Sequence, residues 1–207
     1  IRGPKFDKFS NVFRLLGKKK IIDWTLEYLL NVKPKIDIII SSPDDKVLKY
    51  IKRKKNPRLI AVYRSSALAS ANILLGPSIT DALKKYNLIK KIKPDFAIIT
   101  KLNSPFMDCK HIENAINTIN IFDLDMVLGV STHDKMYFNH NGQTLVPLRT
   151  YDRDTLLNTD GSKINIKIEE EEIYFNSGNF IIYKAKNVKD FDDFQKYRIG
   201  HEVLDRL

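Results

Sequence analysis

The fold class of this chain is decided by residues 36–45, with the sequence Ile-Asp-Ile-Ile-Ile-Ser-Ser-Pro-Asp-Asp. The first half is a short, almost continuous apolar run, which is typical of a parallel strand covered on both faces. The second half starts a helix, because the proline stands where helices commonly begin and the two acids fall in the first turn. Val47, Leu48 and Ile51 give that helix an apolar face. This pattern predicts the first half of a βαβ unit.

The alternation of strand and helix extends in both directions from this segment. A helix is predicted over residues 20–32, and Pro34 prevents its continuation. Further strands are predicted over 58–63, 95–101 and 126–130, and further helices over 76–91 and 108–121. Strands and helices at these intervals indicate right-handed βαβ units. We therefore predict an α/β fold, a three-layer, doubly wound, mostly parallel sheet of the Rossmann-like type.

The rhythm changes at Ser131. Asn141-Gly142 predicts a hairpin turn, and residues 163–168 alternate as an exposed antiparallel strand would. Residues 173–184 then return the chain to the main sheet. We predict one domain over residues 1–207, with an antiparallel segment inserted at about 134–173.

Composition narrows the class of protein. With 207 residues and 43% hydrophobic content, the chain is long enough for one substantial core. No run approaches the roughly 18 apolar residues of a membrane helix, and no leader pattern is present, so we expect a cytoplasmic protein with no membrane partner. A single cysteine, Cys109, can form neither an internal disulfide nor a thiolate metal site.

The net charge of +10 is compatible with nucleic acid, an anionic membrane surface or an anionic small substrate as the partner. Lysines cluster in residues 18–20, 52–55 and 90–93, near predicted helix ends, without interleaved aromatic residues. Solvated helix ends are the favoured interpretation, and we expect no nucleic-acid partner. A basic nucleic-acid-binding domain remains the weakest alternative. It predicts that binding to oligonucleotides is tight and falls steeply with salt concentration.

The first twelve residues have the composition of a phosphate-binding loop. Glycine lets the backbone come close to a ligand, and arginine and lysine supply positive charge to phosphate oxygens. The residues concerned are Arg2, Gly3, Lys5, Lys8, Ser10 and Asn11. A solvated basic segment is the alternative interpretation from these residues alone.

Four segments, in the same order, resemble the cytidylyltransferases that activate acidic sugars, the acylneuraminate (CMP-sialic acid synthetase-like) group. That family has an Arg-Gly-Gly-Ser-Lys…Lys-Asn loop ahead of Gly-Lys-Pro-Leu-Ile; here Arg2-Gly3-Pro4-Lys5 and Ser10-Asn11 precede residues 16–22. Residues 41–45 are similar to the family's Ser-Thr-Asp-Asp turn, and Arg64 with Leu68-Ala69 is similar to its Arg-Pro-x-x-Leu-Ala segment.

The other two segments lie later in the chain. Residues 101–105, Lys-Leu-Asn-Ser-Pro, stand where the family has Gln-Pro-Thr-Ser-Pro. Residues 174–183 are similar to its Asn-Gly-Ala-Ile-Tyr return strand. The resemblance also implies a first strand ahead of Ile1 and a metal-binding Asp-x-Asp beyond Leu207.

The resemblance implies transfer of CMP from CTP to the anomeric hydroxyl of a nonulosonate-type sugar acid, with release of pyrophosphate and with Mg²⁺ as cofactor. The cations placed to act on the triphosphate in catalysis are Arg2, Lys5 and Lys8. The nucleotide contacts are expected from Arg2, Gly3, Ser10, Asn11, Arg64 and Lys101. The sugar contacts are expected from Asn103, Ser104, Asn176 and Gly178. Neither the metal ligands nor the general base can be assigned.

Three departures from the family pattern bear on activity. Ser10 stands where the family has lysine, Lys101 where it has glutamine, and Ala71-Asn72 where it has two acids. A nucleotide-binding relative that has lost catalysis is therefore the alternative function. The resemblance also implies a homodimer made by the inserted segment, with Tyr137, Phe138 and Leu145 between the subunits.

Other candidate chemistry is sparse. The four histidines, at 111, 133, 140 and 201, lack metal-ligand spacing. Asp44 and Asp45 have the chemistry of metal ligands, but acids in a first helical turn more often serve the helix dipole.

Overall fold

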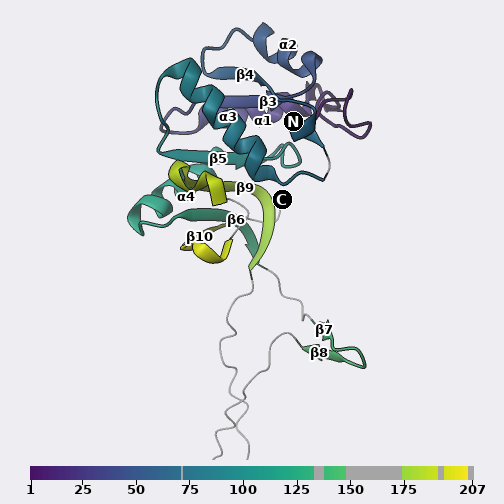
Figure 1. Ribbon diagram of the computed structural model, residues 1–207, viewed down its shortest axis with the longest axis vertical. Coiled ribbons are helices and arrows are strands. Elements are labelled where there is room, and N and C mark those ends of the chain that lie inside the picture. The colour runs from purple at the N-terminus through teal and green to yellow at the C-terminus, as the bar shows by residue number, and fades with distance from the viewer. Residues whose placement is uncertain (71, 133–137, 148–173, 191–193, 205–207) are drawn as a thin grey trace, which may run out of the picture. The chain divides into compact units, whose positions relative to one another are not determined.

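The computed structural model describes residues 1–70, 72–132, 138–147, 174–190 and 194–204 (Figure 1). The chain divides into two compact units. One comprises residues 1–130 and 176–207, and the other comprises residues 131–175.

The predicted βαβ unit at the start of the chain is present. Strand β3 (Ile38–Ser42), helix α2 (Asp45–Arg53) and strand β4 (Leu59–Tyr63) follow one another, and the two strands pair in parallel with Ile38 opposite Leu59. Asp44 caps the helix, and its side chain accepts a hydrogen bond from the Lys46 amide at 2.9 Å.

A four-stranded sheet belongs largely to the first unit and has the order β10-β6-β9-β5. Its strands are β5 (Phe96–Thr100), β6 (Met126–Thr132), β9 (Tyr174–Lys184) and β10 (Ile199–Val203). β6 and β10 pair in parallel, and β5 and β9 pair antiparallel. Helix α4 (Cys109–Ile121), in the range predicted for a helix, connects β5 to β6 and is capped by the Asp108 side chain.

The segment before β3 differs in detail from the prediction. A hairpin of β1 (Leu15–Leu16) and β2 (Lys19–Lys20) turns at Gly17, whose φ is +64°, and α1 (Ile21–Asn31) begins directly after it. Lys19 and Lys20 therefore belong to a short strand, because the glycine allows a tight turn where a helix start was expected.

Helix α3 (Leu75–Lys90) and three 3₁₀ turns complete the first unit. The turns are η1 (Ala67–Ala69), η2 (Ala185–Asp190) and η3 (Phe194–Lys196). α3 ends at Lys91 in the left-handed conformation. No helix within the described ranges is long and apolar enough to cross a membrane.

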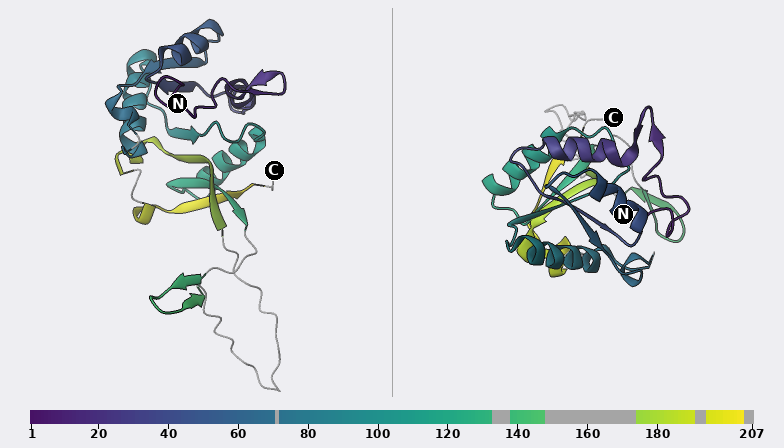
Figure 2. Two further views of the ribbon diagram at one scale, coloured as in Figure 1. Left: turned by 90° about the vertical axis from the view of Figure 1, so that its right-hand side faces the viewer. Right: turned by 90° about the horizontal axis from the view of Figure 1, so that it is seen from above.

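Helices cover both faces of the strands. Seen from above in Figure 2, α1 lies on one side of the strands and α3 on the other. Buried residues of α1, α2 and α4 pack with Ile38 and Ile40 into the larger core. Ile79 and Leu83 of α3 pack on the opposite face, with Met126 and Tyr183. The prediction of a three-layer, mostly parallel α/β fold is confirmed.

The second unit contains the predicted hairpin, formed by β7 (Phe138–His140) and β8 (Leu145–Pro147). Gly142 takes a φ of +99°, and the Asn141 side chain accepts from the amides of Gln143 and Thr144 at 3.0 and 2.8 Å. The predicted strand at 163–168 lies outside the described residues.

Candidate functional site

The candidate site lies where the strands β3, β4 and β5 end. Arg64 follows β4, and its amide donates to the Ser42 carbonyl at the end of β3 at 3.0 Å. Lys101 follows β5, and its amide donates to the Asn179 carbonyl of β9 at 3.3 Å. In open α/β sheets, ligands bind beyond the carboxyl ends of the strands, so this edge is the expected place for a site.

Asp44 anchors the first loop to this edge. Its carboxylate accepts from the Lys5 amide at 3.0 Å as well as from Lys46, and Asp44 is buried. A side chain at Gly3 would have its Cβ 2.3 Å from Asp44 Oδ2. Glycine is therefore required at position 3 by the approach of the loop to Asp44. The Asp44 carboxylate caps the helix and anchors the loop, so its role is structural, and Asp45 is the acid that lies in the first turn.

Two arginines concentrate positive charge at the site. Arg64 is 7% exposed, and its Nε is buried with no hydrogen-bond partner among the described residues. Burial lowers the pKa of the Arg64 guanidinium, the nearby charge of Arg2 lowers it further, and Asp81 raises it. Arg2 itself donates from Nη2 to the Ser70 carbonyl at 3.3 Å. A buried cation beside a second cation is stabilised by an anion between or beside them.

The turns after β5 and within β9 form a polar cluster. Ser104 Oγ donates to Asn179 Oδ1, and the Gly178 amide donates to Asn176 Oδ1 at 2.8 Å. A Cβ placed on Gly178, whose φ is +67°, would lie 2.8 Å from the ammonium nitrogen of Lys101. The structure therefore brings together four of the predicted residues, Lys101, Ser104, Asn176 and Gly178, and adds Asn179.

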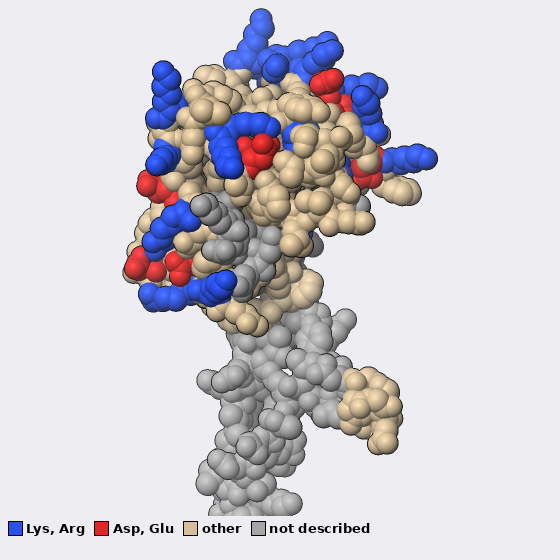
Figure 3. Space-filling view, in the orientation of Figure 1, with Lys and Arg blue, Asp and Glu red and all other residues tan. Residues whose placement is uncertain are grey.

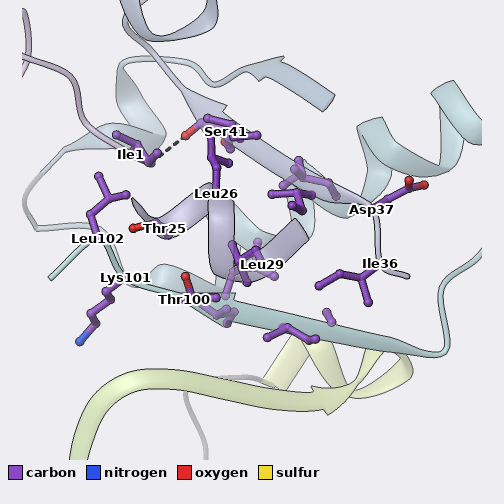
Figure 4. Close-up of a pocket in the computed structure, with 18 of the residues that line it drawn as sticks. Ile1, Thr25, Leu26, Leu29, Ile36, Asp37, Ser41, Thr100, Lys101 and Leu102 are labelled. Atoms are coloured by element: carbon purple, nitrogen blue, oxygen red, sulfur yellow. Dashed lines mark hydrogen bonds between the residues drawn. The ribbon is translucent and has the colours of Figure 1, made fainter. Parts of the chain in front are cut away.

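A cavity of about 930 Å³ opens at this edge. Of the predicted site residues, six line it: Arg2, Ser10, Asn11, Arg64, Lys101 and Asn103. The side chains of Lys5 and Lys8 are exposed on the loop outside the lining. Figure 4 shows Ile1, Leu102 and Lys101 at one end of this space and Ile36 and Asp37 at the other. The cavity thus has a charged mouth and extends inward between β3 and β5.

No group of three or more His, Cys, Asp or Glu in the described part of the chain has an arrangement that could hold a metal ion. His111 instead pairs with Glu202 of β10 at 3.1 Å, which is a structural link between α4 and that strand. The described residues therefore do not provide three or more such ligands for Mg²⁺. Mg²⁺ commonly takes few protein ligands and several from substrate phosphates.

Lysine and arginine side chains project at several separate places on the face drawn in Figure 3, with acidic groups beside several of them. Lys54 pairs with Asp23 at 2.6 Å and Lys90 with Asp37 at 3.2 Å, both near helix ends. This distribution supports the interpretation of the lysine clusters as helix-end surface.

The solved structures that are similar to this chain include the following three. A CMP:2-keto-3-deoxy-manno-octonic acid synthetase complexed with CTP aligns at 10% identity and a TM-score of 0.61, over 94% of this chain and 83% of that one. A 4-diphosphocytidyl-2C-methyl-D-erythritol synthase from Anaerococcus prevotii aligns at 13% identity and 0.61, over 98% and 83%. A cytidylyltransferase from Leptospira borgpetersenii aligns at 13% identity and 0.56, over 99% and 74%.

No protein-family model and no curated protein matches the chain. The three structural similarities show that the chain has the α/β fold of these nucleotidyltransferases.

Sequence reasoning missed three residues of the site. Ser70 accepts from Arg2, Asn179 accepts from Ser104, and Asp81 faces the charge of Arg64. Asn179 carried a signal, since it follows Asn176 and Gly178 in one polar run ahead of an apolar strand. Ser70 and Asp81 carried none, because only the folded chain brings them to the strand ends.

Proposed function

We propose that this protein is a cytidylyltransferase, which transfers CMP from CTP to a sugar acid and releases pyrophosphate. The observation that carries the proposal is the buried Arg64 guanidinium, with an unsatisfied Nε, beside Arg2 at the mouth of a cavity. An unsatisfied buried donor costs about 1–3 kcal/mol, and a phosphate oxygen removes that cost. The printed descriptions of the three similar structures, all of cytidyl-transferring enzymes, support CTP as the nucleotide.

In the proposed reaction the sugar hydroxyl oxygen bonds to the α-phosphorus of CTP, and the hydroxyl proton is released to water. The bond from that phosphorus to the bridging oxygen breaks, and pyrophosphate leaves with the electron pair. Negative charge grows on the leaving group, so cations at the mouth stabilise the transition state more than the ground state. Arg2 and Arg64 are two of the cations that line the cavity, and Lys5 and Lys8 lie on the adjoining loop.

The acceptor is assigned to the polar cluster after β5 and within β9. Lys101 was expected from the sequence to contact the nucleotide, but it lies beside Gly178 of this cluster, and we propose that it supplies a cation for the sugar carboxylate. Asn103, Ser104 and Asn176 supply hydrogen-bonding groups for hydroxyls. Lys101 stands close to Gly178, where a larger residue would displace it. Mg²⁺ is expected to reach the site with the triphosphate, because the described residues do not hold it by themselves.

A thermal-shift screen of CTP, UTP, ATP and GTP with Mg²⁺ tests the nucleotide. CTP at 100 times its Kd is expected to add roughly 2.7 kcal/mol of stability, and the other nucleotides less. Pyrophosphate release with a panel of sugar acids then tests the transfer. Binding of CTP without release for any sugar acid would select the alternative, a nucleotide-binding relative in which Ser10 and the other substitutions have removed catalysis.

The inserted segment is assigned to dimerisation. Leu145 of the hairpin is 64% exposed within one chain, and the hairpin is too small for a core of its own. Light scattering should give the mass of a dimer, and Leu145→Asp should shift it toward the monomer, whereas Gln143→Asp in the exposed turn should leave it unchanged. A monomer at micromolar concentration in the unmodified protein would remove this assignment.

A further inference from the structure

Helix α3 carries a polar stripe, made of Ser78, Asp81 and Lys85, beside its apolar contacts with the sheet. The three residues stand at positions i, i+3 and i+7 of the helix, so their side chains lie along the same face. α3 contacts β3, β4 and η1, and it lies across the strands in Figure 1. The polar stripe therefore comes close to residues 63–70, which lead from the end of β4 through η1.

Two members of the polar stripe bond to main-chain carbonyls of residues 63–70. The Lys85 ammonium donates to the Tyr63 carbonyl at 2.5 Å, and the Ser78 hydroxyl donates to the Leu68 carbonyl at 2.9 Å. Two hydrogen bonds from one helix fix the course of the chain between the two carbonyls. Arg64 is the residue that directly follows the first of them.

The bond from Lys85 acts on the peptide group that joins Tyr63 to Arg64. A trans peptide directs its N–H and its C=O to opposite sides. The Arg64 amide donates to the Ser42 carbonyl of β3 at 3.0 Å, and the Tyr63 carbonyl accepts from Lys85 on the other side. In the described structure β4 pairs with β3 alone. Lys85 therefore supplies the hydrogen bond that a further strand would supply, and the peptide group is held from both sides.

Asp81 holds the Lys85 ammonium in this place. The two side chains pair at 2.7 Å, and the acid stands four residues before the base, which is the favoured order for an ion pair on a helix. Asp81 also acts on Arg64. Burial lowers the pKa of the Arg64 guanidinium most, the charge of Arg2 lowers it further, and the negative charge of Asp81 raises it. One carboxylate thus attracts both the ammonium and the guanidinium.

The direction of the Arg64 side chain depends on its backbone. Its Nε is buried without a hydrogen-bond partner among the described residues, so that donor does not orient the guanidinium. The side chain lines the cavity, where a guanidinium would bind phosphate through donors in a fixed fork. A misplacement of about 1 Å can lower the rate of a reaction on the order of 10²-fold. A bond that fixes the peptide ahead of Arg64 therefore has a functional consequence.

We propose that Lys85 is a positioning residue for Arg64. Its bond to the Tyr63 carbonyl holds the backbone of residue 64 so that the guanidinium faces the phosphates of the bound nucleotide. Lys85 lies outside the cavity lining and acts only through Arg64. This inference rests on the proposed function, because it requires that Arg64 binds the phosphates of CTP.

A double-mutant cycle on CTP binding tests the proposal. Lys85→Met removes the ammonium and keeps a long unbranched side chain, and it is measured alone and together with Arg64→Ala. Lys84→Met is the matched control, because Lys84 is the exposed neighbour on the same helix and its replacement changes the net charge equally. Isothermal titration to millimolar CTP with Mg²⁺ gives the Kd of each variant, and circular dichroism checks that each is folded.

Lys85→Met should raise the Kd of CTP about fivefold when Arg64 is present. In the Arg64→Ala background it should leave the Kd unchanged, because no guanidinium remains to be positioned. Lys84→Met should change the Kd by less than about twofold in either background. Lys85→Arg should recover most of the affinity, since a guanidinium also donates to a carbonyl and pairs with Asp81. If Lys85→Met does not fold, Lys85→Gln takes its place in the cycle.

An equal rise of the Kd in the two backgrounds would overturn the proposal, because Lys85 would then act on the nucleotide without Arg64. Equal effects of Lys85→Met and Lys84→Met would overturn it as well, since only the loss of one charge would be at work. If the unmodified protein binds CTP and Lys85→Met binds it equally well, this inference alone fails. If the unmodified protein does not bind CTP, the proposed function fails, and this inference fails with it.

Discussion

The mouth and the inner part of the cavity are lined by different chemical groups. At the mouth, the buried Nε of Arg64 lacks a hydrogen-bond partner among the described residues, and the charge of Arg2 is nearby. In the inner part of the cavity, between β3 and β5, most of the lining side chains are apolar. The first pattern suits a small anion, and the second suits apolar groups. Substitutions at the mouth should therefore change CMP transfer. Substitutions in the inner part of the cavity should change the free energy of unfolding.

Arg64→Ala should have the largest effect at the mouth. We expect it to reduce CMP transfer by about 10²–10³-fold, as for removal of one donor to transition-state charge. The free energy of unfolding without nucleotide should change little, because the substitution also removes a buried charge that lies close to Arg2. Steady-state kinetics and urea unfolding measure the two quantities.

Arg14→Ala is the matched control, since Arg14 is exposed outside the cavity lining. Equal losses of transfer in the two variants would remove Arg64 from the site.

Leu26→Ala tests the contribution of the inner part of the cavity to stability. Leu26 of α1 is 5% exposed and lines the inner part of the cavity, so its truncation should lower the free energy of unfolding by about 2–3 kcal/mol. The affinity of the folded protein for CTP should stay within about twofold, because no charge at the mouth changes. Leu88→Ala, at a position 78% exposed on α3, should have almost no effect on stability. A selective loss of CTP affinity in Leu26→Ala would break the distinction between the two ends.

Gly178→Ala tests whether the backbone conformation at position 178 affects CMP transfer. Its φ of +67° costs a residue with a side chain about 1–2 kcal/mol, and the new Cβ would meet the Lys101 ammonium. Gly17→Ala is a matched control, because Gly17 has a φ of +64° and nothing within 4 Å of the added Cβ. Both variants should lose similar stability, but only Gly178→Ala should reduce transfer and weaken binding of the sugar acid.

If the control variant loses as much transfer as Gly178→Ala, the closeness of Lys101 to Gly178 has no functional meaning. Kinetics with saturating CTP and variable sugar acid make the comparison.

The layers of the fold could be predicted because their signals are local. The apolar run before Ser42, the proline and acids after it, and the cap at Asp108 each depend on neighbours in sequence. Strand β10 could not be predicted, since Ile-Gly-His-Glu-Val has no strong alternation and is held by its parallel pairing with β6. The β1–β2 hairpin was missed for a similar reason, as its strands are two residues each.

The site was predictable where a strand ends and a loop of distinctive composition follows. Arg64, Lys101 and Ser104 come directly after strands, so their meeting at one edge follows from parallel topology. The role of Asp44 as the anchor of the first loop was not predictable, because it depends on Gly3 approaching from 41 residues earlier in the chain. The cavity between β3 and β5 also could not be predicted from either strand alone, because the unpaired edge of a strand depends on which other strands pair with it.

Lys8→Ala should give the smallest effect and the finest test of the mouth. The chain has Ser10 where the resembled family has lysine, and Lys8 is the nearest cation that could replace it. Lys8 is exposed beside a turn in which the Ser10 amide donates to the Asp7 carbonyl at 3.0 Å. Water and salt therefore screen the attraction between the Lys8 ammonium and a triphosphate. We expect transfer to fall about tenfold, less than for the buried Arg64. Lys49→Ala, at an exposed position on α2, should leave transfer unchanged. High salt should shrink the difference between the two variants, and equal rates for both at low salt would place Lys8 outside the site.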